Sequence, residues 1–391
     1  MMGAREPQMT LYHTIQIEQL VPEDHPFRRI RPLIDVERIR ELCAPYYSAD
    51  NGRPSVPPEQ LFLAMVGGYL LGARSDRKLV MELKCNMAFR WFVGLDLDSA
   101  VWDDTTFSKA RTQRFDATDV LERLFDETVK QAMSRGWVSL HWSADGTLTR
   151  ANASQKSFVA LEVLEKPEEY RKRMKAQGTK ESSSKDEVDK DDRGNPDVDW
   201  RGEKRSNATH QSTSDPDARL GTKSHRETTA PVYQVNGVME NRHRILMGIN
   251  VERFQGPRGE SEGLLALLKR AKARLKLKPK TMGGDKGYFS RSVLKPLKRL
   301  KIKPHIAVMV KRGQAIHRWA KRFARGIGYS LSQRKRKEIE EIWGEGKEHH
   351  GLRRFQRRTL PRVRQDAWLT GWLLNLKRLA SLNTRYGLAT G

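Results

Sequence analysis

The first third of the chain shows the spacing of apolar side chains that is typical of helices. Residues 10–135 predict a series of short helices. The clearest runs over Asp119–Ser134, where apolar side chains form one stripe that ends before Gly136. Several short helices in succession fit a DNA-binding module of the helix-turn-helix type, and they fit a structural helical domain almost as well.

At Trp137 the period of the pattern changes to two. Apolar and polar side chains alternate over Trp137–Asp145, which predicts a strand. Asp145 and Gly146 form a dipeptide that favours a tight turn, so Thr147–Ala151 is expected to pair back as a second strand. Residues 231–238 and 244–251 predict another strand pair.

Beyond residue 260 the predicted helices and strands are interleaved. A helix is expected over Ser261–Leu275, and a short strand over Lys280–Gly284 delivers Asp285. There follow a helix from about residue 290, a strand over His305–Val310, a long helix from about residue 333 and a last helix over Arg364–Ala380. This alternation indicates an α/β fold.

No such pattern exists between Glu162 and Asp199. Lys180–Asp199 has no aromatic side chain and is rich in Lys, Glu, Ser and Asp. Such a segment buries too little apolar surface to offset the entropy lost on ordering. We therefore expect a flexible insertion over about 162–199.

Charge separates the chain into two parts. The formal net charge is +25, and residues 266–391 hold 34 Lys and Arg against 7 Asp and Glu. Such a concentrated basic surface predicts binding to a polyanion, nucleic acid or an acidic membrane, while solubility alone is the other explanation. No apolar run of membrane-spanning length occurs, so no membrane span is expected.

Carboxylates are scarce in the basic part, which makes each of them informative. Asp285 and Asp145 each stand at the end of a predicted strand, where ligands usually dock in α/β sheets. Gly283 and Gly284 would leave room there for a bulky ligand. Two strand-end carboxylates and one helical carboxylate could hold a divalent metal for phosphoryl transfer. The alternative is that Asp145 caps a turn and Asp285 caps a helix.

A third acidic position lies between cations on one helix face. Arg336, Glu340, Trp343 and Lys347 are spaced 4, 3 and 4 residues apart. An acid between two cations could hold a metal while the cations bind phosphates. Ordinary charge pairing on a solvated helix is the alternative.

With these motifs in order, the chain resembles bacterial insertion-sequence transposases of the DDE type, which have a ribonuclease-H-like catalytic domain. Gln333, Arg336, Glu340 and Lys347 match the spacing of the family signature Y-x2-R-x3-E-x6-K, with Gln in place of Tyr. The other matching stretches are 20–26 (LVPEDHP), 52–111 with DTTFS at 104–108, 144–147 (ADGT), 151–158 (ANASQKSF), 201–207 (RGEKRSN), 213–219 (TSDPDAR) and 284–288 (GDKGY).

The resemblance implies a site and its partners. Asp145, Asp285 and Glu340 would be catalytic and would bind two Mg²⁺ (or Mn²⁺) ions roughly 3.5–4 Å apart. Arg336 and Lys347 would hold the scissile phosphate. The partners would be DNA, both transposon ends and target, and no membrane, with a homodimer on DNA because two ends are cut. The basic C-terminal segment would hold the transposon end through Arg353, Arg354, Arg357 and Arg358.

The resemblance also implies an organisation and a location. We expect an N-terminal helical DNA-binding domain over 1–135, a ribonuclease-H-like mixed sheet flanked by helices over 136–350, and a basic helical segment over 351–391. Residues 1–8 contain no apolar signal core, and the two cysteines, Cys43 and Cys85, have no neighbours at zinc-ligand spacing. These features favour the bacterial cytoplasm, in association with the nucleoid.

Two other functions stay open at this point. One is a metal-dependent nuclease that cuts DNA without joining strands. The other is a catalytically decayed copy that acts only as a DNA-binding protein, for which the hint is Glu345 in place of the Trp that the family usually has.

Overall fold

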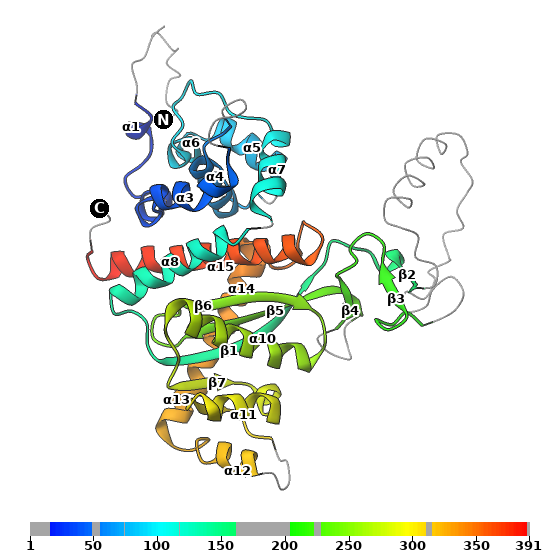
Figure 1. The fold of residues 1–391 in the computed structure, drawn as a ribbon. Coiled ribbons are helices and arrows are strands. Elements are labelled where there is room, and N and C mark those ends of the chain that lie inside the picture. Colours follow the sequence, from blue (N-terminus) through cyan, green and yellow to red (C-terminus); the bar gives the residue numbers. More distant parts are fainter. Residues whose placement is uncertain are drawn as a thin grey trace, which may run out of the picture.

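The computed structural model describes residues 16–48, 55–73, 75–116, 118–161, 204–222, 228–309 and 315–388. Figure 1 shows a group of N-terminal helices, a twisted sheet, and two long helices, α8 and α15, that run between them. The predicted flexible insertion, including Lys180–Asp199, lies outside the described residues.

The N-terminal region is helical, as predicted. Helix α4 lies at its centre, and its glycines allow close packing: a Cβ on Gly67 would lie 2.4 Å from the Phe89 ring, and one on Gly68 would lie 2.6 Å from Leu79. The Asn86 side chain caps the helix that carries Phe89. The helices are α1 Ile17–Leu20, α2 Pro26–Ile30, α3 Val36–Cys43, α4 Pro58–Leu70, α5 Asp76–Cys85, α6 Met87–Val93, α7 Asp104–Ala110 and α8 Val120–Ser134.

A mixed sheet forms the centre of the second region. Its strands lie in the order β6-β5-β1-β7-β8, with short β4 also pairing with β5. Strands β6, β5 and β1 are antiparallel neighbours, whereas β1, β7 and β8 run parallel. The predicted ribonuclease-H-like mixed sheet is thereby confirmed. The strands are β1 His141–Arg150, β4 Arg219–Gly221, β5 Ala230–Glu240, β6 Leu246–Arg253, β7 Thr281–Gly284 and β8 Lys303–Ile306, with β2 Phe158–Ala160 and β3 His210–Ser212 as a separate ribbon.

The tight turn predicted at Asp145 and Gly146 is wrong. Both residues lie inside β1, which continues to Arg150 and pairs along its whole length with β5. The glycine serves close packing instead of a turn: a Cβ on Gly146 would lie 3.1 Å from Glu260 Cγ and 3.2 Å from Asn236 Oδ1. A local turn signal was overridden by long-range strand pairing.

Helices cover both faces of the sheet. Helix α10 packs on the face that Gly146 and Asn236 present, and its Gly263 approaches the Asn236 side chain. Side chains at the next position along each strand point to the opposite face of the sheet. On that face, Trp343 of α14 packs over Gly237. The helices of this region are α10 Pro257–Arg270, which continues as a π turn over Ala271–Leu275, α11 Arg291–Arg299, α12 Ala315–Lys321, α13 Gly326–Arg336, α14 Glu338–His349 and α15 Leu360–Arg385.

The single long helix expected from about residue 333 is two helices. Lys337 separates α13 from α14, because its N–H bonds to the Arg334 carbonyl and its carbonyl accepts from the Glu340 N–H. Both hydrogen bonds join residues three positions apart, as in a 3₁₀ helix, and not four positions apart, as in an α-helix. The regular α-helix therefore ends at this point.

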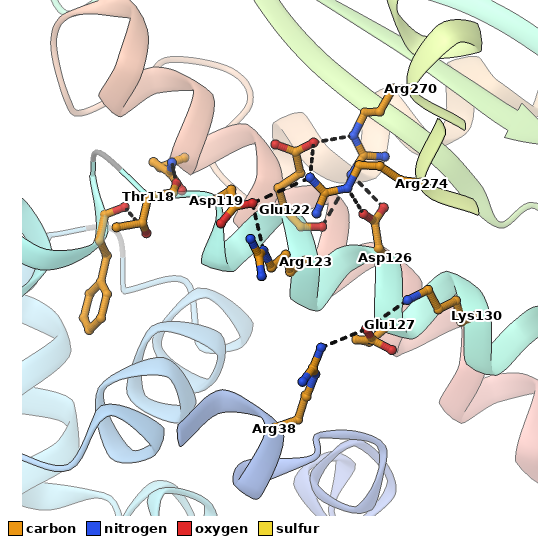
Figure 2. Close-up of polar contacts among 12 residues, drawn as sticks. Arg38, Thr118, Asp119, Glu122, Arg123, Asp126, Glu127, Lys130, Arg270 and Arg274 are labelled. Carbon is orange, nitrogen blue, oxygen red and sulfur yellow. Dashed lines mark hydrogen bonds and ion pairs between the residues drawn. The ribbon is translucent and has the colours of Figure 1, made fainter. Parts of the chain in front are cut away.

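Helix α8 joins the helical region to the sheet through charged side chains. Figure 2 shows the Asp126 carboxylate between Arg270 and Arg274, each at 2.6 Å, and Glu122 accepting from Arg270 at 2.6 Å. Asp126 is almost fully buried, so these two cations match a charge that could not stay there alone.

Helix α15 lies between the two regions. Its Trp368 ring packs edge-on against Phe125 of α8 with centroids 5.1 Å apart, and its Asn375 side chain bonds both main-chain groups of Leu246 on β6. The helix predicted over Arg364–Ala380 is thus confirmed, and it is largely buried. No helix in the described ranges is long and apolar enough to cross a membrane.

Candidate active site

Two of the predicted carboxylates stand at matching positions on neighbouring parallel strands. Ser143 of β1 pairs with Gly283 of β7, and Asp145 and Asp285 each follow two residues later. Adjacent strands lie about 4.8 Å apart, so this register puts both residues at the same end of the sheet. Asp285 sits in the turn just after β7, where its Oδ1 accepts from the Gly287 N–H at 2.8 Å.

The third predicted carboxylate approaches from a helix. Glu340 lies in the first turn of α14, a helix that contacts β1 and whose Trp343 packs over Gly237 of β5. Its side chain is 59% exposed, and Oε1 lies 3.4 Å from the guanidinium of Arg336, the last residue of α13. The predicted pairing of these two residues along the helix therefore forms across the junction of two helices.

The charges of the three carboxylates act on one another. Burial is the main reason why the pKa of Asp145 is raised to about 6. The charges of Asp285 and Glu340 act in the same direction, whereas the Gly146 N–H and Arg336 lower this pKa. A divalent cation would relieve this repulsion, and carboxylate oxygens are the donors that Mg²⁺ and Mn²⁺ prefer. The donor atoms of these residues therefore suit such an ion in their chemistry.

The side chains do not form a closed metal shell. Within the described ranges, no group of three or more His, Cys, Asp or Glu side chains is close enough to hold a metal ion. Glu340 is instead engaged by Arg336, whose Nε is buried and has no hydrogen-bond partner in the same ranges.

The glycines before Asp285 make room for protein and not for a ligand, which corrects our expectation. A Cβ on Gly283 would lie 2.9 Å from Ser143 Oγ, and one on Gly284 would lie 3.1 Å from the Tyr288 ring. Tyr288 is buried, and its pKa is raised by burial and then by the charges of Glu260, Asp145 and Asp285.

Sequence reasoning missed Glu260. It lies in the first turn of α10, beside the glycines that follow the two aspartates. Its Oε1 is 3.3 Å from where a Cβ on Gly146 would be, and its Oε2 is 3.5 Å from the equivalent point on Gly287. The sequence signal is the glycine itself, because a missing side chain next to Asp145 leaves space for another residue.

The other members of the signature have separate places. The Gln333 side chain donates to the carbonyls of His305 at 2.5 Å and Gly284 at 3.4 Å, which fixes α13 to the ends of β8 and β7. Lys347 is half-buried, two turns along α14 from Glu340. Glu345 is paired with Lys377, which balances its charge, and lies 3.7 Å from the His350 ring.

The four arginines expected to hold the transposon end are bonded to the protein. Arg353 and Arg354 lie beside Arg150, at the far end of β1, about 17 Å along the strand from Asp145. Arg353 pairs with Glu348, Arg354 donates to Asn152 Oδ1 at 3.3 Å, Arg358 donates to the Asn152 carbonyl at 3.1 Å, and Arg357 pairs with Asp116 and with Asp366 at 2.8 Å.

Two family models match the chain. One, described as "Transposase domain (DUF772)", matches residues 15–113, and the other, described as "Transposase DDE domain", matches residues 198–376. The second range includes Asp285 and Glu340 and begins after Asp145. No curated protein sequence matches the chain.

Among solved structures, the chain is similar to complexes of the Mos1 transposase. The paired-end complex with the left transposon end is 8% identical, with a TM-score of 0.20 over 76% of this chain and 81% of that chain. The Mos1 mariner paired-end complex with Mn is 11% identical, with a TM-score of 0.19 over 76% and 80%. Values this low support no conclusion about function.

Proposed function

Because the chain belongs to the DDE-type transposases, we propose that it cuts DNA at the ends of an insertion sequence and joins those ends to a target by metal-dependent phosphoryl transfer. The observation that best supports this is the matched register of Asp145 and Asp285 on β1 and β7, with Glu340 approaching from α14. Hydrolytic and strand-transfer chemistry on DNA both need carboxylates so placed.

Asp145, Asp285 and Glu340 are proposed to hold two divalent ions, Mg²⁺ or Mn²⁺. When bound, such ions supply an activated water or 3′-hydroxyl and stabilise the leaving oxygen. Two of these carboxylates are positioned by strands, whereas Glu340 has an exposed side chain that can move.

Arg336 is proposed to bind phosphate. Its guanidinium is largely buried and contacts Glu340, and its Nε has no hydrogen-bond partner among the residues that the structure describes. If Glu340 turns toward the aspartates, the guanidinium gains free donors, which suit the two oxygens of a phosphodiester. Lys347 is proposed to assist as a second cation on the same side of α14.

The wider assignments follow from the same proposal. The partners are transposon-end and target DNA, held by a homodimer, and the protein works at the nucleoid of a bacterial cell. The N-terminal helices (1–135) bind DNA, 136–350 is the catalytic domain, and the segment 351–391 contributes Arg353, Arg354 and Arg358 to the DNA surface.

The test separates chemistry from DNA binding. Glu340→Gln keeps the size of the side chain and removes its charge, so cleavage of an end-bearing duplex in Mg²⁺ should be abolished while DNA affinity stays equal or rises slightly. The matched control is Glu341→Gln on the same helix, since Glu341 pairs with Arg244 at 2.8 Å. Near-normal cleavage by Glu340→Gln would contradict the proposal.

Strand-transfer assays on a plasmid target decide between a transposase and a nuclease that only cuts. A wild-type chain that binds end-bearing DNA but never cuts it would instead be a decayed copy. The structure gives that alternative no support from Glu345, because Lys377 balances its charge.

A further inference from the structure

A cleft of about 690 Å³ lies between α11 and α12, outside the site described above. Among the described residues, every charged side chain that lines it is basic. The lining residues are Arg291, Lys295, Lys298, Arg299, Ala315 and Ile316.

The four cations lie on one side of α11. Their spacing of 4, 3 and 1 residues keeps them together, while Val293, Leu294 and Leu297 are buried on the opposite side. Like charges four residues apart destabilise a helix. The helix therefore has a repulsive surface that its own sequence does not balance.

No carboxylate balances this surface within the described ranges either. No ion pair there involves Arg291, Lys295, Lys298 or Arg299. Of the four side chains, Lys298 lies near an aromatic ring, with its Nζ 5.9 Å from the Trp319 ring centroid. In contrast, Arg270 and Arg274 on the preceding helix are matched by acids of α8 (Figure 2).

The cleft is also close in sequence and space to the site. Helix α11 begins six residues after Asp285 and packs against α10 and β8. Its nine residues span about 12 Å, which corresponds to about three or four phosphates of one DNA strand. A backbone bound along α11 would begin near the end of β7, where Asp285 lies, and lead from there toward the start of β8.

We propose that this α11 cleft binds the phosphate backbone of duplex DNA next to the cut site, without reading its sequence. The proposal rests on the proposed function and adds a surface to it. Point-charge contacts from four exposed side chains would add affinity and salt dependence, because each neutralised phosphate releases counterions.

The test removes the four charges together. Arg291→Gln, Lys295→Gln, Lys298→Gln and Arg299→Gln in one chain should weaken binding of end-bearing and random duplexes alike, by at least about tenfold in 0.1 M salt. The slope of log affinity against log salt should fall by about 2–4. The matched control removes four exposed charges from α10 and the residues that follow it: Lys269→Gln, Lys272→Gln, Lys276→Gln and Lys280→Gln.

A conservative variant guards against a folding artefact. Lys295→Arg with Lys298→Arg keeps the charge and should retain wild-type affinity and slope, and circular dichroism should show all three variants folded. Cleavage at saturating DNA should survive in the glutamine variant, because the carboxylates are intact.

Three results would overturn the inference. One is a glutamine variant whose salt slope is unchanged. If Glu340→Gln still abolishes cleavage in that case, the assignment of the α11 cleft fails and the proposed function stands. Another is an equal loss in the control. The third is loss of binding to phosphatidylserine vesicles with DNA affinity unchanged, which would assign the cleft to a membrane surface. A wild-type chain that neither binds nor cuts DNA would refute the proposed function itself.

Discussion

The segment 353–358 and the α11 cleft are equally basic, yet they use their charges differently. Each has four cations within ten residues. In the segment, all four are bonded to the protein, and Arg357 lies between two buried carboxylates, Asp116 and Asp366. In the cleft, the described residues offer no acid to any of the four. The two regions differ in whether a buried carboxylate holds the cation, as it holds Arg357, or the cation stays exposed and can reach DNA.

Burial explains why the two regions differ. A guanidinium taken out of water needs a carboxylate partner, or its desolvation is not compensated. Arg357 is 17% exposed and has two such partners. An exposed cation gains little from a pair and stays available to a ligand. Breaking the pair of a buried arginine should therefore lower stability, whereas removing an exposed cation should lower DNA affinity.

The largest effect is expected at Asp366. Its carboxylate binds Arg111 at 2.7 Å and Arg357 at 2.8 Å, and all three side chains are mostly buried. Asp366→Ala leaves two guanidiniums short of a partner, so the free energy of unfolding should fall by about 3–5 kcal/mol in urea titrations. Glu348→Gln, which breaks the exposed pair with Arg353, should cost no more than about 1 kcal/mol. Equal costs would remove the distinction between paired and exposed arginines.

A smaller effect is expected at Glu345, another carboxylate that is paired with a cation, Lys377. His350 and then Lys377 lower the pKa of this carboxyl to about 2. A depressed pKa stabilises the fold above the unfolded-state value of about 4.5, and this contribution is lost as the pH falls toward 2. Glu345→Gln should thus lower the free energy of unfolding at pH 6 by about 2–3 kcal/mol.

Urea titrations at several pH values check this prediction through its shape. The gap between wild type and Glu345→Gln should close as the pH falls from about 4.5 to 2. A gap that is constant across that range would mean that the carboxylate charge does not contribute.

The smallest effect is expected on α11 and has the opposite sign. Lys295 has cations four residues away on both sides, Arg291 and Arg299, so Lys295→Gln should raise the free energy of unfolding by a few tenths, about 0.2–0.5 kcal/mol, in low salt. The gain should vanish in about 1 M salt. Lys130→Gln, which loses a pair with Glu127, should instead be slightly destabilising. A destabilised Lys295→Gln would point to an acid partner near α11.

The spacing of apolar and polar residues predicted the parts of the site that depend on residues close in sequence. Alternation placed Asp145 in its strand, the pattern after residue 260 placed Asp285 at the end of another, and the family resemblance supplied Glu340. The pattern could not show that β1 continues through Gly146, because that depends on pairing with β5, some 90 residues away.

Long-range pairs were equally out of reach. Arg357 resembled a DNA contact in the sequence, since its partner Asp116 lies 241 positions earlier. Glu260 resembled an ordinary acid at a helix start, and only the packing of α10 over Gly146 brings it to the aspartates.

The position of α15 has a consequence for how the protein is made. Helix α8 ends at Ser134 and its partner α15 begins at Leu360, so about 226 residues must be translated between them. At about 5–20 residues per second, this takes about 11–45 s, during which Phe125 and its neighbours have no cover from Trp368. The nascent chain therefore exposes an apolar surface on the ribosome for much of its synthesis, and chaperones that hold such surfaces have that interval in which to act.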